Sequence, residues 1–372
     1  MINLFFDKTV QDDLSQIFQN LEPHNKKFHK KVVLITGGAG FLGYYLTYYL
    51  AFLRLKMGID VSVIITDNFV RGRPSWLKVV EEEWSSFLKI IEHDIIEPIE
   101  DEVIKLKPNF IVHAASIASP IFYRKRPIET MDANILGLRT LLDYSLSRKS
   151  RGEPIDGFLF YSSSEIYGSP SPEFIPTPEN YNGNVSCTGP RACYDESKRF
   201  GETLCVNFAN QENLPIKIAR PFNNYGPGLK LDDGRVVSDF ANNILNGEDI
   251  VLLSDGKASR TFCYIVDAIS GYLLVLLNGE KGESYNIGIE EPEITIGSFA
   301  KLFADVGKKS FGVSSNVIFK TSDDLEYNTD NPERRCPKID KAKSIGYNPS
   351  VSLEDGLTRT LTWYKRYVET LG

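Results

Sequence analysis

The chain alternates short apolar runs with longer amphipathic stretches, the pattern of strands that alternate with helices. Apolar runs rich in β-branched and aromatic residues predict strands that are buried on both faces. Helical stretches fill the gaps between them, which favours right-handed crossovers and a doubly wound parallel sheet in an α/β fold. The predicted strands span 31–37, 61–67, 87–94, 110–116, 158–164 and 216–220, and the clearest helices span 41–58, 134–147 and 194–210.

Three regions differ in their patterning. Residues 1–30 read as an N-terminal extension with one short amphipathic helix from about Val10 to Leu21, and residues 31–220 carry the regular strand–helix alternation. After residue 220 proline, glycine and asparagine become frequent, so we expect 221–372 to be mostly a smaller C-terminal substrate-binding lobe. Segments within 250–290, such as 261–277, are apolar enough to return to the core.

Composition excludes several classes of protein. The 372 residues are 42% hydrophobic and carry a net charge of −7 without a long basic run, which argues against nucleic acid as a partner. The apolar runs are shorter than the roughly 18 residues of a membrane span, and the N-terminus lacks the pattern of a signal peptide. The five cysteines and four histidines are too scattered for a disulfide framework or a metal site. We therefore expect a reduced, cytoplasmic protein without a bound metal.

A glycine motif follows the first predicted strand and opens a helix. In TGGAGFLG (36–43), Gly37, Gly40 and Gly43 have the G-x-x-G-x-x-G spacing, and Phe41 and Leu42 begin the helix. Such glycines allow a tight turn, a close approach of a pyrophosphate to the backbone and close packing of helix on strand. In the strand–turn–helix context the motif predicts a Rossmann-type dinucleotide site.

Residues at the ends of the next strands extend this site. Asp67, followed by Asn68, ends the second strand, where a carboxylate accepts hydrogen bonds from the adenosine ribose and favours NAD over NADP. The nearby arginines at 71 and 73 weaken that preference, and a plain turn residue is the other interpretation of Asp67. Further along, Asp94-Ile95 is expected near the adenine, and the small Ala114-Ala115 lets a dinucleotide pass close to the backbone.

Tyr194 and Lys198 form a Y-x-x-x-K pair on one face of a predicted helix. A lysine ammonium beside a phenol favours the phenolate, so the tyrosine becomes a usable base. The pair follows the hydroxyl cluster 162–164, in which Ser163 could share the proton of a substrate hydroxyl, with a strand-end turn as the alternative interpretation. Glu165 comes next, at the sheet edge where ligands bind in such folds, although a solvated loop acid would look the same.

Five arginines in mixed segments are candidate ligands for a diphosphate or a carboxylate, because a guanidinium group binds both in bidentate fashion. For any single one, a surface charge is the favoured interpretation over a ligand. Arg235 and Arg260 are the better candidates among Arg191, Arg235, Arg260, Arg334 and Arg335.

These motifs together resemble the extended short-chain dehydrogenases/reductases that modify nucleotide sugars, the NAD-dependent epimerase/dehydratase family. The resemblance runs from about Lys31 to Tyr367, and one matching segment, TGPRACYDESKRFGETL (188–204), contains the long and specific run GPRACYDESKR. Within the family the chain is most similar to the members that decarboxylate UDP-glucuronate. The other matching segments are DNFVRGRPSW (67–76), HDIIEP (93–98), HAASIASPIFY (113–123) and DGRVVSDF (233–240).

The resemblance implies a mechanism, an NAD cofactor and a nucleotide-sugar substrate. Tyr194 would take the proton of the sugar 4-hydroxyl while C4 is oxidised, and the resulting β-keto acid would lose CO2. Ser163, Glu165 and Arg335 would manage the decarboxylation. The implied substrate-binding residues are Ser119, Ser164, Asn223, Arg235, Arg260 and Arg335, of which Asn223, Arg235 and Arg260 would hold the diphosphate.

Other outcomes of C4 oxidation stay open. A 4,6-dehydratase is the nearest alternative, a 4-epimerase comes next, and a non-catalytic NAD-binding protein is disfavoured because Tyr194 and Lys198 are both present. The resemblance also implies a homodimer formed through the helices at 134–147 and 194–210. Their apolar positions are equally consistent with internal packing; these are Ile135, Leu138, Leu141, Leu142, Leu204 and Phe208.

Overall fold

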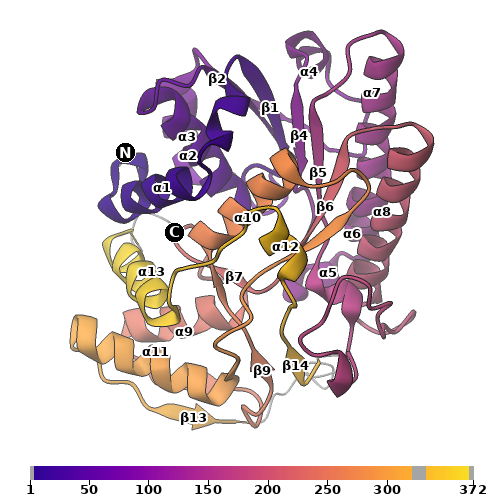
Figure 1. Cartoon of the computed structure of the whole chain (residues 1–372). Coiled ribbons are helices and arrows are strands. Elements are labelled where there is room, and N and C mark those ends of the chain that lie inside the picture. Colours follow the sequence, from indigo (N-terminus) through magenta and orange to yellow (C-terminus); the bar gives the residue numbers. More distant parts are fainter. Residues whose placement is uncertain (1–3, 321–331, 368–372) are drawn as a thin grey trace.

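The structure, a computed structural model, describes residues 4–320 and 332–367. Within them, seven parallel strands form one sheet in the order β11–β6–β5–β4–β1–β2–β3 (Figure 1). This confirms the doubly wound sheet, and the strand order reverses between β1 and β4, where ligands bind in open α/β sheets. The strands are β1 (Lys31–Thr36), β2 (Val61–Asp67), β3 (Leu88–Glu92), β4 (Phe110–His113), β5 (Gly157–Tyr161), β6 (Ile216–Pro221) and β11 (Ser284–Ile287).

Several strands end earlier than their apolar runs predict. The run 110–116 leaves the sheet after His113, and the run 158–164 leaves it after Tyr161. The residues that follow are small or carry hydroxyl groups, and they turn out of the sheet at its carboxyl edge. The segments expected to meet the ligand are therefore loops that the sheet holds in place.

Helices cover both faces of the sheet, because alternate strand residues face opposite sides. Val33 and Ile35 pack toward α2 (Phe41–Leu55), α3 (Ser75–Trp84) and α10 (Ile265–Asn278), whereas Leu34 packs toward the other layer. Helix α10 and strand β11 bring residues beyond 220 into the sheet layer. Within the described part of the chain, no helix is both long and apolar enough to cross a membrane. The second layer contains α4 (Asp101–Leu106), α7 (Leu138–Ser150) and α8 (Ala192–Gln211).

The helix predicted at 134–147 has a different start. Residues Ala133–Gly137 form a π-helical turn, and α7 continues from Leu138 to Ser150. Leu138, Leu141 and Leu142 have no exposed surface because they pack against the sheet. These three leucines therefore pack inside the subunit, the second of the two interpretations that the sequence left open.

The remaining elements build the second lobe and the loops beside the cleft. Helices α9, α11 and α13 pack together there, and α10 connects this lobe to the sheet. The helices are α5 (Pro120–Lys125), α6 (Pro127–Asp132), α9 (Val236–Asn246), α11 (Ile296–Phe311), α12 (Asp340–Ser344) and α13 (Leu353–Tyr367). The short strands are β7 (Asn224–Tyr225), β8 (Ile250–Leu252), β9 (Ser259–Arg260), β10 (Cys263–Tyr264), β12 (Ile294–Thr295), β13 (Val317–Phe319) and β14 (Arg334–Arg335).

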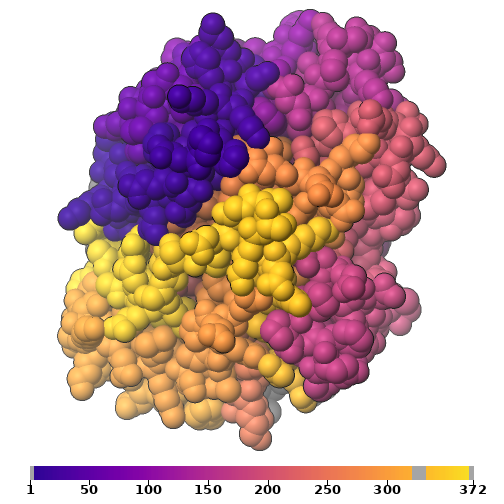
Figure 2. All heavy atoms as spheres, in the orientation of Figure 1, coloured from indigo at the N-terminus to yellow at the C-terminus, as the bar shows by residue number. Residues whose placement is uncertain are grey.

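The N-terminal extension packs on the protein rather than projecting from it. Its helix α1 (Lys8–Asn20) begins at Asp7, whose carboxylate accepts the backbone N–H of Val10, and it contacts α2 and α10. The space-filling view shows the N-terminal residues directly against the C-terminal residues (Figure 2). Asp13 on α1 is fully buried, and its carboxylate accepts hydrogen bonds from Tyr45, Tyr264 and Arg359 at 2.7–2.9 Å. One carboxylate thus ties α1 to α2, β10 and α13.

We expect Asp13→Asn to remove a pH-dependent loss of stability. Burial raises the pKa of Asp13 to about 6 despite its hydrogen bonds. A raised pKa in the folded state means that stability falls as pH rises from the ordinary value toward 6, by about 3 kcal/mol for a shift of about two units. The neutral amide avoids this loss. Urea unfolding between pH 4 and 7 should show that the free energy of unfolding falls with pH in the parent protein and not in Asp13→Asn. The exposed neighbour Asp12 provides the control variant, Asp12→Asn. Equal pH slopes in all three proteins would contradict the expectation.

Candidate active site

All the residues predicted for cofactor, substrate and catalysis line one cleft of about 2350 Å³ at the carboxyl edge of the sheet. The second lobe forms its other wall. Among the described residues that line it, twelve are Lys or Arg and ten are Asp or Glu, although the whole chain has 42 basic and 49 acidic residues. The acidic protein therefore concentrates positive charge in its cleft, as binding of an anionic ligand requires.

The glycine loop has no room for side chains. Gly37 has a φ of +69°, and a Cβ there would lie 2.6 Å from the backbone of Ala115 in the loop after β4. Gly40 precedes the first residue of α2, so the helix N-terminus faces the cleft. A Cβ on Gly43 would lie 2.3 Å from the carbonyl oxygen of Gly38. The loop thus has the close backbone approach that a dinucleotide pyrophosphate needs, and the residues fit NAD.

Gly43→Ala should therefore weaken both the fold and cofactor binding. The added methyl group must push the turn away from α2, and overpacking of this kind costs about 1–3 kcal/mol. We expect a lower melting temperature and less NAD in the purified protein. Gly297→Ala is the matched control, because the nearest atom to a Cβ there is 3.4 Å away. Equal NAD content in the Gly43→Ala variant and this control would show that the tight turn is not needed.

Asp67 is hydrogen-bonded to the glycine loop. Its carboxylate accepts the backbone N–H groups of Ala39 at 3.0 Å and Phe69 at 2.8 Å, while burial raises its pKa. The neighbouring Asn68 donates to the Asp94 carboxylate at 3.0 Å. The loops after β2 and β3 are thus joined at the adenosine end predicted from the sequence.

Tyr194, Lys198 and Ser163 meet in the middle of the cleft. Tyr194 and Lys198 lie one turn apart on α8, and the Lys198 ammonium group is 5.8 Å from the centre of the Tyr194 ring. Lys198 Nζ also donates to the backbone carbonyl of Tyr161 at the end of β5, at 2.8 Å. Ser163 hydrogen-bonds to the Tyr194 hydroxyl and accepts the backbone N–H of Glu165 at 3.2 Å. The sheet end and the helix thus bring the three groups together.

Burial works against ionisation of both members of the pair. It raises the pKa of Tyr194 to about 12, with the Ser163 hydrogen bond acting in the opposite direction. It lowers the pKa of Lys198 to about 7. Near neutral pH the free protein therefore holds a protonated phenol beside a lysine that is partly neutral. The expectation that the lysine charge alone produces the phenolate is too simple, because desolvation outweighs it here.

Glu165 sits between two arginines. Arg335 on β14 binds it with two parallel hydrogen bonds of 2.5 and 2.6 Å, and Arg191, which precedes α8, donates to the same carboxylate. Burial alone would raise the pKa of Glu165, but Arg191 and Arg335 hold it at about 2. The carboxylate therefore stays ionised between the two guanidinium groups, and the buried Asp195 lies 3.8 Å from Arg191.

The other predicted substrate residues lie along the second lobe. Arg260 pairs in register with Arg335, and its guanidinium donates to the backbone carbonyls of Ser259, Glu333 and Pro332. Burial, helped by the charge of Arg335, lowers the pKa of Arg260 to about 9. Asn223 adopts a φ of +37° and donates to the carbonyl of Thr261 at 2.9 Å.

Two more of them meet at the loop before α9. Arg235 pairs with Asp233 and lies 5.9 Å from the centre of the Phe41 ring. Ser119 donates to the Asp233 carbonyl at 2.7 Å. The backbone around Asp233 therefore connects the glycine-loop helix, α5 and the second lobe.

Two site residues were missed or ranked too low by sequence reasoning. Tyr123 on α5 stacks on Tyr194, with ring centres 5.1 Å apart and planes 12° from parallel. Arg191 ranked below Arg235 and Arg260, yet it contacts Glu165 directly. Its place three residues before Tyr194, at the start of the same helix, is the signal that could have singled it out.

Several known proteins are similar to this chain over most of its length. UDP-glucuronic acid decarboxylase 1 of Xenopus tropicalis is 38% identical over 344 residues, covering 91% of this chain and 73% of that protein. UDP-glucuronic acid decarboxylase 6 of Arabidopsis thaliana is 36% identical over 338 residues, covering 90% and 89%. Among solved structures, UDP-glucuronic acid 4-epimerase of Bacillus cereus, in complex with UDP-glucuronic acid and NAD, has a TM-score of 0.70 at 25% identity and covers 90% of this chain and 99% of its own.

The family comparison covers the sheet and most of the cleft. The model of the NAD-dependent epimerase/dehydratase family matches residues 33–288, from β1 to the residue after β11. This range includes the glycine loop, Ser163, Tyr194 and Lys198, so the motifs found in the sequence are the ones that the structure gathers in one place. The chain belongs to the NAD-dependent epimerase/dehydratase family.

Proposed function

We propose that the protein decarboxylates UDP-glucuronate to a UDP-pentose, in a reaction that begins with oxidation at C4. The observation that carries the proposal is the buried Arg191–Glu165–Arg335 cluster beside Ser163 and Tyr194. Two guanidinium groups next to a base suit a sugar that carries a carboxylate. The similarity to decarboxylases over about 90% of the chain supports the same conclusion.

In this proposal Tyr194 receives the proton of the sugar 4-hydroxyl, with Ser163 sharing that hydrogen bond and Lys198 stabilising the phenolate. NAD, when bound, would supply the hydride acceptor for oxidation at C4 and the hydride that is returned at the end of the cycle. The glycine loop, Asp67 and the Asn68–Asp94 pair would hold this cofactor.

The decarboxylation step follows from the C4 ketone. The C5–C6 bond breaks, CO2 leaves, and the electron pair moves into the C4 carbonyl to form an enolate, which then takes up one proton at C5 from solvent. We propose that Arg335 and Arg191 stabilise the negative charges of this step. Glu165 holds both arginines in place, and its low pKa makes it a poor proton donor while they remain paired. Arg235, Arg260 and Asn223 are proposed to bind the diphosphate.

A 4-epimerase acting on the same uronic acid is the second candidate, favoured by the similarity to the Bacillus cereus enzyme. The two reactions share C4 oxidation and differ in whether CO2 leaves. A 4,6-dehydratase would need an acid for the 6-hydroxyl. Ser164-Glu165 offers only a carboxylate held ionised by arginines, which disfavours that outcome.

The test is incubation of the purified protein with UDP-glucuronate and, separately, with UDP-, dTDP- and GDP-hexoses, without added NAD. We expect UDP-glucuronate to lose the mass of CO2. An unchanged mass with an inverted C4 centre would make the protein an epimerase. Loss of water from a neutral hexose would make it a dehydratase, and either result would overturn the proposal.

We further propose that the protein is cytoplasmic, because its five free thiols would persist in a reducing compartment. We also propose that it works as a homodimer. Helices α6 and α8 pack on each other and on the π turn, and together they expose Ile128 (60%), Leu136 (50%) and Phe200 (48%). Such an apolar surface favours self-association. Light scattering should give a dimer mass for the protein and a monomer mass for Phe200→Glu; a monomeric parent protein would refute the dimer.

A further inference from the structure

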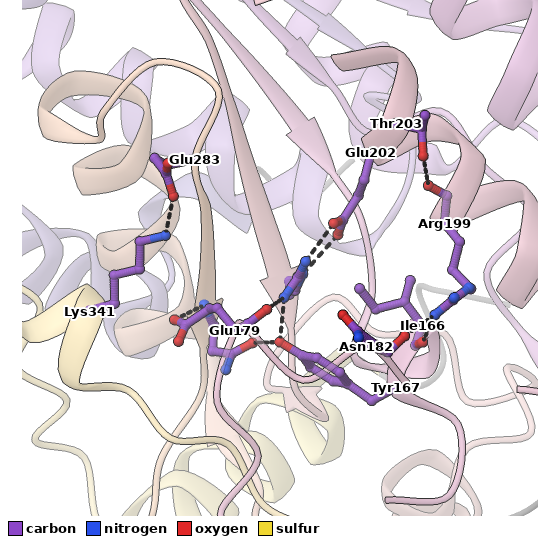
Figure 3. A network of polar contacts seen from close by, with 11 residues as sticks. Ile166, Tyr167, Glu179, Asn182, Arg199, Glu202, Thr203, Glu283 and Lys341 are labelled. Carbon is purple, nitrogen blue, oxygen red and sulfur yellow. Dashed lines mark hydrogen bonds and ion pairs between the residues drawn. The ribbon is translucent and has the colours of Figure 1, made fainter. Parts of the chain in front are cut away.

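A buried charged group lies outside the cleft and is not used in the proposed reaction. Arg220 on β6 is 8% exposed, and its guanidinium makes four hydrogen bonds. Two go to the Glu202 carboxylate on α8, at 2.8 and 2.6 Å. The others go to the Tyr167 hydroxyl at 2.6 Å and to the Glu179 carbonyl at 2.8 Å. Figure 3 shows Glu202 and Tyr167 pointing toward each other across this network.

Asn286 on β11 continues the network toward the C-terminal segment. Its side-chain carbonyl accepts the Tyr167 hydroxyl at 2.7 Å, and its amide donates to the backbone carbonyls of Thr177 at 2.9 Å and Lys338 at 3.0 Å. Asn286 has no exposed surface. Two backbone hydrogen bonds add to this junction, from Thr177 to Cys336 and from Lys338 to Thr177.

The network joins the segments that carry the charged cluster of the cleft. Tyr167 comes two residues after Glu165 in a single 3-10 turn, and Lys338 comes three residues after Arg335, which lies on a two-residue strand. Neither Glu165 nor Arg335 is held by a long helix or by the sheet. Glu202 lies on α8, the helix of Tyr194 and Lys198. Arg199 on the same helix also donates to the carbonyls of Ile166 and Asn182 (Figure 3).

We propose that Arg220, Tyr167 and Asn286 act together as positioning residues that fix the Glu165–Arg335 pair relative to Tyr194. The pair joins residues 170 positions apart in the chain, so its geometry depends on how the two segments that carry it are held relative to each other. A misplacement of about 1 Å can cost about 100-fold in rate, so a rigid connection between the segments matters. The expected effect on kcat rests on the proposed decarboxylation. The positioning of the Glu165–Arg335 pair does not.

Tyr167→Phe is the sharpest variant, because it removes the hydroxyl at the centre of the network and keeps the ring that packs on Ile166 and Phe222. Tyr285→Phe is the matched control. Tyr285 is next to Asn286, is 1% exposed, and its hydroxyl accepts one backbone N–H, from Glu280 at 2.9 Å. Both variants lose one buried hydroxyl, but Tyr167 loses two hydrogen bonds and Tyr285 loses one, so the comparison uses kinetics and local exchange rather than stability.

We expect Tyr167→Phe to lower kcat for CO2 release about 10- to 100-fold, with KM for UDP-glucuronate close to that of the parent protein. The acidic limb of its pH profile should move upward, because a loosened Arg335 no longer holds the pKa of Glu165 as low. Tyr285→Phe should keep the parent kcat and pH profile. Unchanged kinetics in Tyr167→Phe, or equal losses in both variants, would overturn the proposal.

Hydrogen–deuterium exchange tests the same inference without substrate. Tyr167→Phe should increase exchange in both 164–179 and 334–339, and Tyr285→Phe should not. A parent protein that fails to release CO2 would overturn the proposed function, while the exchange result would still decide the positioning role. Unchanged exchange in both segments of Tyr167→Phe would refute that role whatever the substrate.

Discussion

Tyr194→Phe is expected to lower kcat by about 10²- to 10⁴-fold, the range that a positioned general base contributes. The substitution removes only the phenolic hydroxyl. The ring keeps its stacking contact with Tyr123 and its place on α8, so the fold should survive. We expect the effect on kcat because the proton is transferred during oxidation at C4 and not when the substrate binds.

The measurement is the rate of CO2 release from saturating UDP-glucuronate. Tyr225→Phe is a suitable control, because Tyr225 is fully buried and its hydroxyl donates to the Leu353 carbonyl at 3.3 Å, away from Tyr194. It should lose stability without a large loss of kcat. If Tyr194→Phe stays within a few-fold of the parent rate, another group must be the base, and the role proposed for the Tyr194–Lys198 pair is wrong.

Arg335→Met should have the second largest effect, a loss in kcat of about 10²- to 10³-fold, which is typical for removal of one preorganised electrostatic group. The variant leaves Glu165 with Arg191 as its cationic partner. Because burial raises the pKa of Glu165 and Arg335 opposes this, the pKa must rise in the variant. In the parent protein, ionised Glu165 contributes to the free energy of unfolding above the ordinary pKa of a glutamate, and this contribution is lost as the pH falls toward 2. In the variant, the same contribution should be lost at a higher pH.

Arg334→Met is the matched control for this prediction. Arg334 is the preceding residue on the same short strand, but it is exposed and pairs with Glu293 at 2.9 and 2.7 Å. We expect it to keep the parent rate, since surface ion pairs contribute little, roughly 0–1 kcal/mol. Equal rates for Arg334→Met and Arg335→Met would mean that the Glu165–Arg335 pair does not take part in decarboxylation.

The sequence predicted the parts of the site that depend on neighbouring residues. The glycine loop, Asp67 after β2, and the Tyr194–Lys198 pair each follow from spacing within one element or one turn, and all of them line the same cleft. The strand–helix alternation likewise predicted the parallel sheet. These features are local because periodicity and turn chemistry act over a few residues.

The tertiary structure decided what depends on distant residues. It chose Arg335 and Arg191 as the partners of Glu165, turned Leu138, Leu141 and Leu142 inward, and buried Asp13 against three other segments. It also made β11 the seventh strand. The physical reason is that a buried charge or an apolar helix face is stabilised by whichever group folding brings beside it. Nothing within a few residues of Glu165 or Asp13 specifies which group that is.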